Sequence, residues 1–317
     1  MSDNDGGSGG DTKKYYEYAP SMAANIVFVV LFVLVTLGHT FFMFKMRTWY
    51  FIPFVVGILF EAVGYILRVI SAGETYPNYT FIPYLLQTLL ILLGPSLMAA
   101  SVYMVLGRLI RLLDANQYAL IRTNWTTKVF VLGDVLSFVT QGAGGGILAN
   151  ADDKSGQDLG RAVILVGLGI QVVFFGLFII TTVVFHVRIR KNPTPRSFSV
   201  SGPWRHLIMA LYAASVLILV RSIFRMIEFG AGRDSVLMTK EVYLLVLDAV
   251  LMFLVAVVFL WRFPGKVLVG YKEISRLGTS AGGVTDEESS SGRDGIPLKA
   301  GNRRQGATQA YEPYMER

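Results

Sequence analysis

The chain contains no cysteine among its 317 residues, only three histidines, and few charged residues, which make up 16% of the total. The absence of cysteine excludes disulfides, iron–sulfur clusters, thiolate zinc sites and cysteine nucleophiles. His39, His186 and His206 are too far apart in the sequence to suggest a zinc site. An ordinary soluble domain is about 25% charged. The low charge, together with a hydrophobic fraction of 53%, argues against a soluble enzyme.

Several functional motifs are also missing. The sequence has no G-x-x-x-x-G-K-[ST] loop, which argues against ATP hydrolysis by a P-loop. The last apolar run has no lysine at its centre to hold retinal, and the Asp-Arg-Tyr and Asn-Pro-x-x-Tyr motifs of G-protein-coupled receptors are absent. We therefore expect no enzymatic activity, no cofactor and no metal. The net charge of +7 lies mostly in short loops and in the tail, so we expect no nucleic-acid partner.

Long apolar runs are what the sequence does contain. A bilayer core requires about 20 mostly apolar residues per helix. Seven runs meet this length, at residues 22–44, 49–70, 81–107, 127–149, 161–186, 204–229 and 239–262. They predict an all-α integral membrane protein with a seven-transmembrane-helix bundle. We expect a flexible N-terminal segment at 1–20, the bundle at 21–265 and a largely disordered tail at 266–317, because both ends are polar.

The distribution of basic residues predicts the orientation, since lysine and arginine accumulate on the cytoplasmic side. One side carries thirteen of them near span ends, namely Lys45, Arg47, Arg108, Arg111, Arg122, Arg188, Arg190, Lys191, Arg196, Arg262, Lys266, Lys272 and Arg276. The other side carries four, namely Lys13, Lys14, Lys154 and Arg233. This places the N-terminus outside and the C-terminus in the cytoplasm. The sequon at Asn78 then lies outside and is a candidate glycosylation site, whereas the sequon at Asn124 faces the cytoplasm.

Polar residues inside the apolar runs are the candidate functional residues. An intramembrane charge costs about 2.5–3.5 kcal/mol on insertion scales, so each needs a partner or a polar cavity. The candidates for substrate binding or transport are Glu61, Arg68, Asp134, Gln141, Gln171, Arg221, Arg225, Glu228 and Asp248. Glu61 and Arg68 share a helix face, as do Asp134 and Gln141, because seven residues complete about two helical turns. Arg221, Arg225 and Glu228 form one stripe.

Most of these candidates fall between the midplane and the predicted outer surface, so they predict a polar cavity in the outer half of the bundle. The alternative is a set of structural salt bridges that orders the helices and contacts no substrate. Four further candidates are positions where a helix could break, namely Pro95, Gly144, Gly145 and Gly146. Broken spans are common at transporter binding sites. The alternative for the glycines is close helix packing, with Gly142 and Gly146 as a GxxxG pair.

The sequence resembles one family, the fungal lipid-translocating exporters, also called resistance-to-aminocholesterol-like proteins. The resemblance runs from about Tyr16 to about Pro264. It comprises Tyr16 to Ser21 with Asn25, Gly64-Tyr65 with Arg68, Pro95 to Ala100 with Tyr103 and Leu106-Gly107-Arg108, Asp134 through Gln141 to Gly144-Gly145-Gly146, Gly167-Leu168 with Gln171, Arg221 to Arg225 with Glu228, and Glu241 with Asp248. The family usually has an aromatic residue where this chain has Val242.

The resemblance implies a seven-span fungal protein that moves or extrudes membrane lipids or amphiphilic small molecules, such as sphingoid bases or sterol-like toxins, through the predicted cavity. A cationic head group would favour Glu61, Glu228 or Asp248, and an anionic one would favour Arg68, Arg221 or Arg225. Two alternatives remain open, namely a lipid sensor that regulates the response to membrane stress and a transporter of porphyrin or haem. The plasma membrane is the expected location, with an internal membrane as the alternative.

Overall fold

The computed structural model of the protein describes residues 21–73, 81–151, 153–199, 204–231 and 241–268. Every regular element in these ranges is helical. The elements are α1 (Met22–Met46), η1 (Trp49–Phe51), α2 (Ile52–Ala72), α3 (Phe81–Leu112), η2 (Asn116–Tyr118), α4 (Thr123–Asn150), α5 (Lys154–Lys191), α6 (Pro195–Ser199), α7 (Trp204–Ala231), α9 (Glu241–Leu244), η3 (Leu245–Val250) and α10 (Leu251–Trp261). η1 and η2 are 3-10 helices, whereas η3 is a π-helix that joins α9 to α10.

Seven helices within the described residues are long and apolar enough to cross a membrane, which confirms the predicted fold class. The seventh of these spans runs through α9, η3 and α10 to Leu268. The fifth span differs most from the prediction, because α5 begins at Lys154 rather than near residue 161. The Asp153 side chain caps this helix by accepting a hydrogen bond from the Gly156 amide at 3.2 Å, so the helix continues through a polar first turn.

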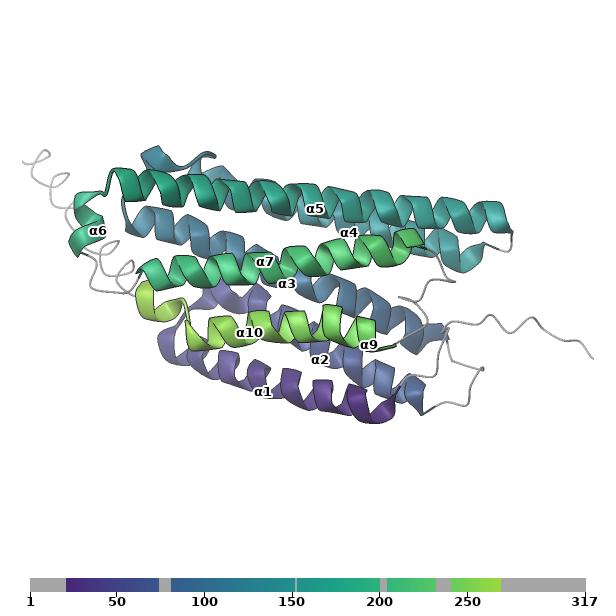
Figure 1. Cartoon of the computed structure of the whole chain (residues 1–317). Helices are drawn as coiled ribbons and strands as arrows, with labels where there is room; N and C mark the ends of the chain where they lie inside the picture. Colours follow the sequence, from purple (N-terminus) through teal and green to yellow (C-terminus); the bar gives the residue numbers. More distant parts are fainter. Residues whose placement is uncertain (1–20, 74–80, 152, 200–203, 232–240, 269–317) are drawn as a thin grey trace, which may run out of the picture. The chain divides into compact units, whose positions relative to one another are not determined.

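The spans pack around the bundle in sequence order (Figure 1). α1 packs on α2, α2 on α3, α3 on α4, and α4 on α5. The ring continues through α5 with α7 and α7 with α10, and it closes where α10 contacts α1. α3 also contacts α7 across the ring. This arrangement brings polar residues of the second, third, sixth and seventh spans to one interior.

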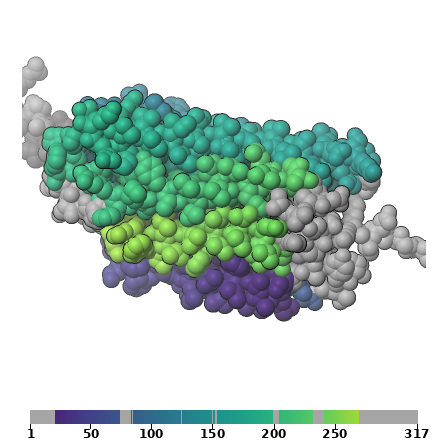
Figure 2. Space-filling model, viewed as in Figure 1, coloured from purple at the N-terminus to yellow at the C-terminus, as the bar shows by residue number. Residues whose placement is uncertain are grey.

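The helices differ in how much of their surface is exposed. Half or more of the apolar stretch is buried in α2, α3 and α7, whereas only 22% is buried in α1 and 28% in α4. Large apolar side chains such as Leu37 on α1 and Leu132 on α4 point outward. Figure 2 shows one face of the molecule, where α5, α7, α10 and α1 follow one another. Outward apolar side chains on long helices are expected where lipid surrounds a bundle.

Glycines allow α2 and α3 to pack with almost no space between their backbones. A Cβ atom added at Gly57 would lie 2.6 Å from the carbonyl oxygen of Gly94, and one added at Gly94 would lie 2.9 Å from the carbonyl oxygen of Gly57. Small residues at a crossing permit this approach, which strengthens van der Waals contact between helices in lipid. The crossing places Glu61, one turn after Gly57, directly against α3.

Replacing Gly57 with alanine should therefore destabilise the bundle. The nearest atom to the added methyl group is a backbone carbonyl oxygen, so the helices must separate, at a cost of about 1–3 kcal/mol. The measurement is the thermal unfolding midpoint of the detergent-purified protein. Gly169→Ala on α5 is the matched control, because no atom lies within 4 Å of its added Cβ. An equal effect of both substitutions would contradict the close crossing.

Candidate functional site

The centre of the candidate site is a group of four charged residues on α7 and η3. Arg221 and Arg225 both donate to Asp248, from Arg221 Nε to Oδ1 at 2.5 Å and from Arg225 Nη2 to Oδ2 at 2.5 Å. Arg225 Nη1 also donates to Glu228 at 3.1 Å. Arg221 and Asp248 are 0% exposed. We refer to Arg221, Arg225, Glu228 and Asp248 as the ion network. Each oxygen of Asp248 thus pairs with a different arginine.

Asp248 lies in a π-helical segment, the only one among the described elements. A π turn contains about one residue more than an α turn and is frequently found at functional sites. α7 presents its two arginines one turn apart, at positions 221 and 225. The irregular turn in the seventh span positions a single carboxylate between them. The π-helical segment therefore carries the carboxylate that makes the two shortest ion pairs of the network.

A second backbone irregularity supplies another partner for Arg221. Pro95 lies inside α3 and has no N–H to donate to the carbonyl of Ile91, four residues earlier. Arg221 Nη2 donates to this carbonyl at 2.9 Å. α3 continues through Pro95 as one helix, so the candidate break at this position is not seen among the described residues. The proline instead leaves one acceptor open at the position that the buried arginine reaches.

Glu61 on α2 lies beside the ion network but makes no hydrogen bond within the described residues. The side chain is 0% exposed, and both carboxylate oxygens lack a hydrogen-bond partner there. Its charged neighbours are Asp248, Arg221 and Arg225. A Cβ atom added at Gly94 would lie 3.1 Å from Oε1 of Glu61, so the carboxylate packs against the α3 backbone just before Pro95. A buried carboxylate without a hydrogen bond is costly.

A further polar contact joins the first, second and seventh spans near the predicted outer surface. Arg68 Nη2 lies 3.4 Å from Glu241 Oε1. The same glutamate accepts a hydrogen bond from Asn25 Nδ2 at 2.9 Å and from the Ser21 amide at 2.7 Å. Three spans therefore meet at one carboxylate at the start of α9.

The glutamines form a separate, uncharged group between α3, α4 and α5. Gln141 donates to Ser137 Oγ at 2.5 Å and to Gln171 Oε1 at 3.4 Å. Ser137 donates to the carbonyl of Gly167 at 2.7 Å, and Gln171 donates to Ser96 at 3.3 Å. Neutral hydrogen bonds of this kind contribute about 0.5–1.5 kcal/mol each. They connect the third, fourth and fifth spans without a charge.

Asp134 lies apart from both groups. It sits next to Tyr103 on α3. The side chain is 5% exposed. Asp134 and Gln141 share the buried face of α4, as their spacing predicts, but Asp134 does not contact the ion network.

The glycine-rich part of α4 is helical in this structure, so the candidate breaks at Gly144, Gly145 and Gly146 are not seen among the described residues. Close packing is the better description, although the residues differ from the predicted GxxxG pair. A Cβ atom at Gly144 would lie 2.8 Å from the carbonyl oxygen of Gly160 on α5. Nothing lies within 4 Å of a Cβ added at Gly142, Gly145 or Gly146.

The structure thus groups the sequence-predicted candidates in four places. Glu61, Arg221, Arg225, Glu228 and Asp248 lie together, Arg68 contacts Glu241, Gln141 contacts Gln171, and Asp134 lies beside Tyr103. Sequence analysis did not select Glu241, Asn25, Ser137 or Ser96 as site residues. The spacing of Glu241 could have identified it. Glu241 lies seven residues before Asp248, which is about two helical turns and so the same helix face. The candidate glycosylation site Asn78 lies outside the described residues.

Seven apolar helices around buried ion pairs define a multi-pass integral membrane protein. The chain belongs to the family described as "RTA1 like protein", whose sequence model matches residues 54–270. Protoporphyrin uptake protein 1 of Saccharomyces cerevisiae is 35% identical over 83% of this chain and 96% of the relative. The probable lipid transporter atnI of Emericella nidulans is 30% identical over 80% of this chain and 68% of the relative.

A more distant relative is the sphingoid long-chain base transporter RSB1 of Saccharomyces cerevisiae, which is 24% identical over 81% of this chain and 75% of the relative. No solved structure is detectably similar to the chain. The family match includes every residue of the ion network together with Glu61, Arg68 and Glu241.

The ion network should dominate the stability of this region. Asp248→Asn should destabilise the protein by about 3–5 kcal/mol, because it leaves two buried arginines with reduced compensation. Adding Arg221→Gln to Asp248→Asn should cost less than the sum of the two single changes, since the pair is already lost. The measurement is a double-mutant cycle, which compares the unfolding midpoints of wild type, the two single variants and the double variant. Additive effects would show that the two residues are not energetically coupled.

Proposed function

We propose that the protein translocates or extrudes amphiphiles across a bilayer, with the polar head group passing the ion network while the tail contacts lipid. The observation that carries the proposal is Glu61, a fully buried carboxylate that lacks a hydrogen bond and borders the ion network. Relatives named as a lipid transporter and as a sphingoid long-chain base transporter support the same class of substrate. An intramembrane ionisable group of this kind marks a substrate or proton pathway.

The charges around Glu61 favour a cationic head group. Glu61, Glu228 and Asp248 face two arginines, Arg221 and Arg225, so the fully ionised group carries one excess negative charge. Arg68 does not change this difference, because Glu241 lies beside it. A single ammonium group or a proton would balance the excess. A sphingoid base carries such an ammonium on a long apolar tail, whereas a porphyrin carries carboxylates and would have to bind the arginines instead.

Transport also requires that the network open. Arg221, Glu61 and Asp248 are 0% exposed, so the described conformation is closed around them. An arriving cation that pairs with Glu61 would compete with Arg221 and Arg225 for the neighbouring carboxylates. Exchange of one buried ion pair for another would limit the desolvation cost of opening the network.

Neutralising Glu61 tests this role with little risk to the fold, because its oxygens make no hydrogen bond that the change would remove. In proteoliposomes, Glu61→Gln should lower the flip rate of a labelled long-chain base about tenfold or more, since the buried cation loses about 1.4 kcal/mol or more of compensation. Asp248→Asn and Arg225→Ala should also lower it. The exposed Asp158→Asn on α5 is the control and should behave as wild type.

Two outcomes would overturn the proposal. Equal flip rates for wild type and Glu61→Gln would remove the assigned role of Glu61. Saturable binding of the long-chain base without any flip in defined vesicles would instead favour a lipid sensor, for which the closed network gives some support.

We also propose the orientation that the basic residues predict, with residues 1–20 outside, residues 266–317 in the cytoplasm and the plasma membrane as the location. Support comes from the thirteen-to-four excess of lysine and arginine on one side. The helical bundle itself is compatible with either orientation.

The absence of cysteine makes the orientation easy to measure. A membrane-impermeant maleimide should label Thr75→Cys on intact cells, because residue 75 follows the second span on the predicted outer side. Gln117→Cys, on the opposite side, should be labelled only after permeabilisation. The reverse pattern would show that the orientation is inverted.

A further inference from the structure

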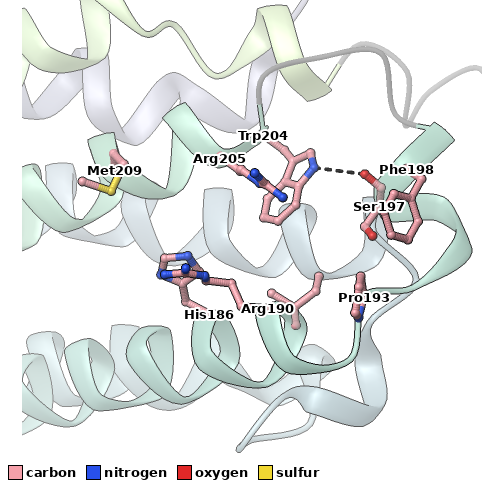
Figure 3. A pocket seen from close by; sticks show the side chains of 9 residues that line it. His186, Arg190, Pro193, Ser197, Phe198, Trp204, Arg205 and Met209 are labelled. Carbon is pink, nitrogen blue, oxygen red and sulfur yellow. Dashed lines mark hydrogen bonds between the residues drawn. The ribbon is translucent and has the colours of Figure 1, made fainter. Parts of the chain in front are cut away.

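A cavity of about 440 Å³ lies between the end of α5, α6 and the start of α7. Its walls include His186, Arg190, Ser197, Phe198, Trp204 and Arg205. Figure 3 shows α5 contributing His186 and Arg190, and α7 contributing Trp204 and Arg205, on facing sides of this space. Arg205 and Arg221 are separated along α7 by about 24 Å at 1.5 Å per residue. The cavity is therefore distinct from the ion network, and its role does not depend on the proposed function.

The described walls of the cavity are cationic. None of the described residues that line it is Asp or Glu. Arg190 and Arg205 make no ion pair with an acidic residue in the described part of the chain, and both lie close enough to His186 to affect its electrostatics. Two guanidinium groups that face one space without a carboxylate are poised for an external anion. Arginine binds phosphate oxygens through two parallel hydrogen bonds, which suits this arrangement.

The remaining walls are apolar and continue onto the exposed surface. Phe198 on α6 is 77% exposed and Met209 on α7 is 60% exposed. Trp204 is buried, and its indole donates to the Ser197 carbonyl at 3.2 Å, which connects α7 to α6 (Figure 3). The basic cavity can bind an anionic group, and the exposed apolar side chains beside it can contact hydrocarbon.

We propose that this cavity binds the phosphate head group of an anionic membrane lipid, with Arg190 and Arg205 holding the phosphate and Phe198 and Met209 contacting its acyl chains. A phosphomonoester fits best, because its two negative charges match the two arginines. The position at the ends of two spans places the phosphate at head-group depth, where basic pockets between helices bind anionic lipids. A soluble phosphate could use the same arginines but would leave the exposed apolar side chains without a partner.

The test compares three probes on the detergent-purified full chain, namely phosphatidic acid, phosphatidylcholine and inorganic phosphate. Ligand-dependent shifts of the thermal unfolding midpoint report the apparent affinity of each probe. We expect phosphatidic acid to stabilise the wild-type protein and the other two to have little effect. Arg190→Gln/Arg205→Gln should weaken phosphatidic acid binding about tenfold or more through loss of two charge-assisted contacts.

The matched control is Arg188→Gln/Lys191→Gln, which removes the same net charge, here entirely from the end of α5, but changes no residue of the cavity wall. Its affinity for phosphatidic acid should stay near that of wild type. Equal weakening in both double variants would show non-specific charge attraction and overturn the proposal. Binding of inorganic phosphate as tight as that of phosphatidic acid would assign the cavity to a soluble anion, and this too would overturn the lipid assignment.

Discussion

Two arginines buried in the bundle share one aspartate, and much of the interior is arranged around that contact. Desolvating a charge costs several kcal/mol, and only close pairing with good geometry offsets this penalty. Asp248 gives one oxygen to each arginine, and Arg221 takes its remaining contact from a backbone carbonyl on α3. Pro95 and the π segment therefore have a common explanation. Each departs from regular helix geometry where the arginines need an acceptor.

The sequence predicted the spans and their buried faces well because both depend on local periodicity. Apolar length defined seven helices, and the spacing of Arg221, Arg225 and Glu228 identified one buried stripe on α7. The identity of the partners depends on which helices are neighbours, and the spacing of residues within one helix does not give that information. The contact of Glu241 with Arg68, which joins the second and seventh spans, could therefore not be predicted.

Backbone irregularity was the part that sequence reasoning predicted least well. A glycine-rich stretch can unwind or permit close packing, and the choice is made by the facing helix. Gly144 meets Gly160 on α5, so the helix stays intact and the two backbones approach. At Pro95 the missing N–H was predictable from chemistry alone. That a side chain 126 residues later in the chain would use the open carbonyl was not.

The charged contacts are distributed unevenly around the bundle. The ion pairs found in the described part of the chain involve α2, α7 and the seventh span, and none involves α4 or α5. α4 and α5 pack tightly on each other through glycines, and their polar contacts with other spans are neutral, such as Gln171 with Ser96. Breaking a buried charge pair costs about 3–5 kcal/mol, more than a neutral hydrogen bond contributes. The softest direction for deforming this bundle is therefore a displacement of α4 and α5 together as one paired unit, which leaves the ion pairs among the described residues intact.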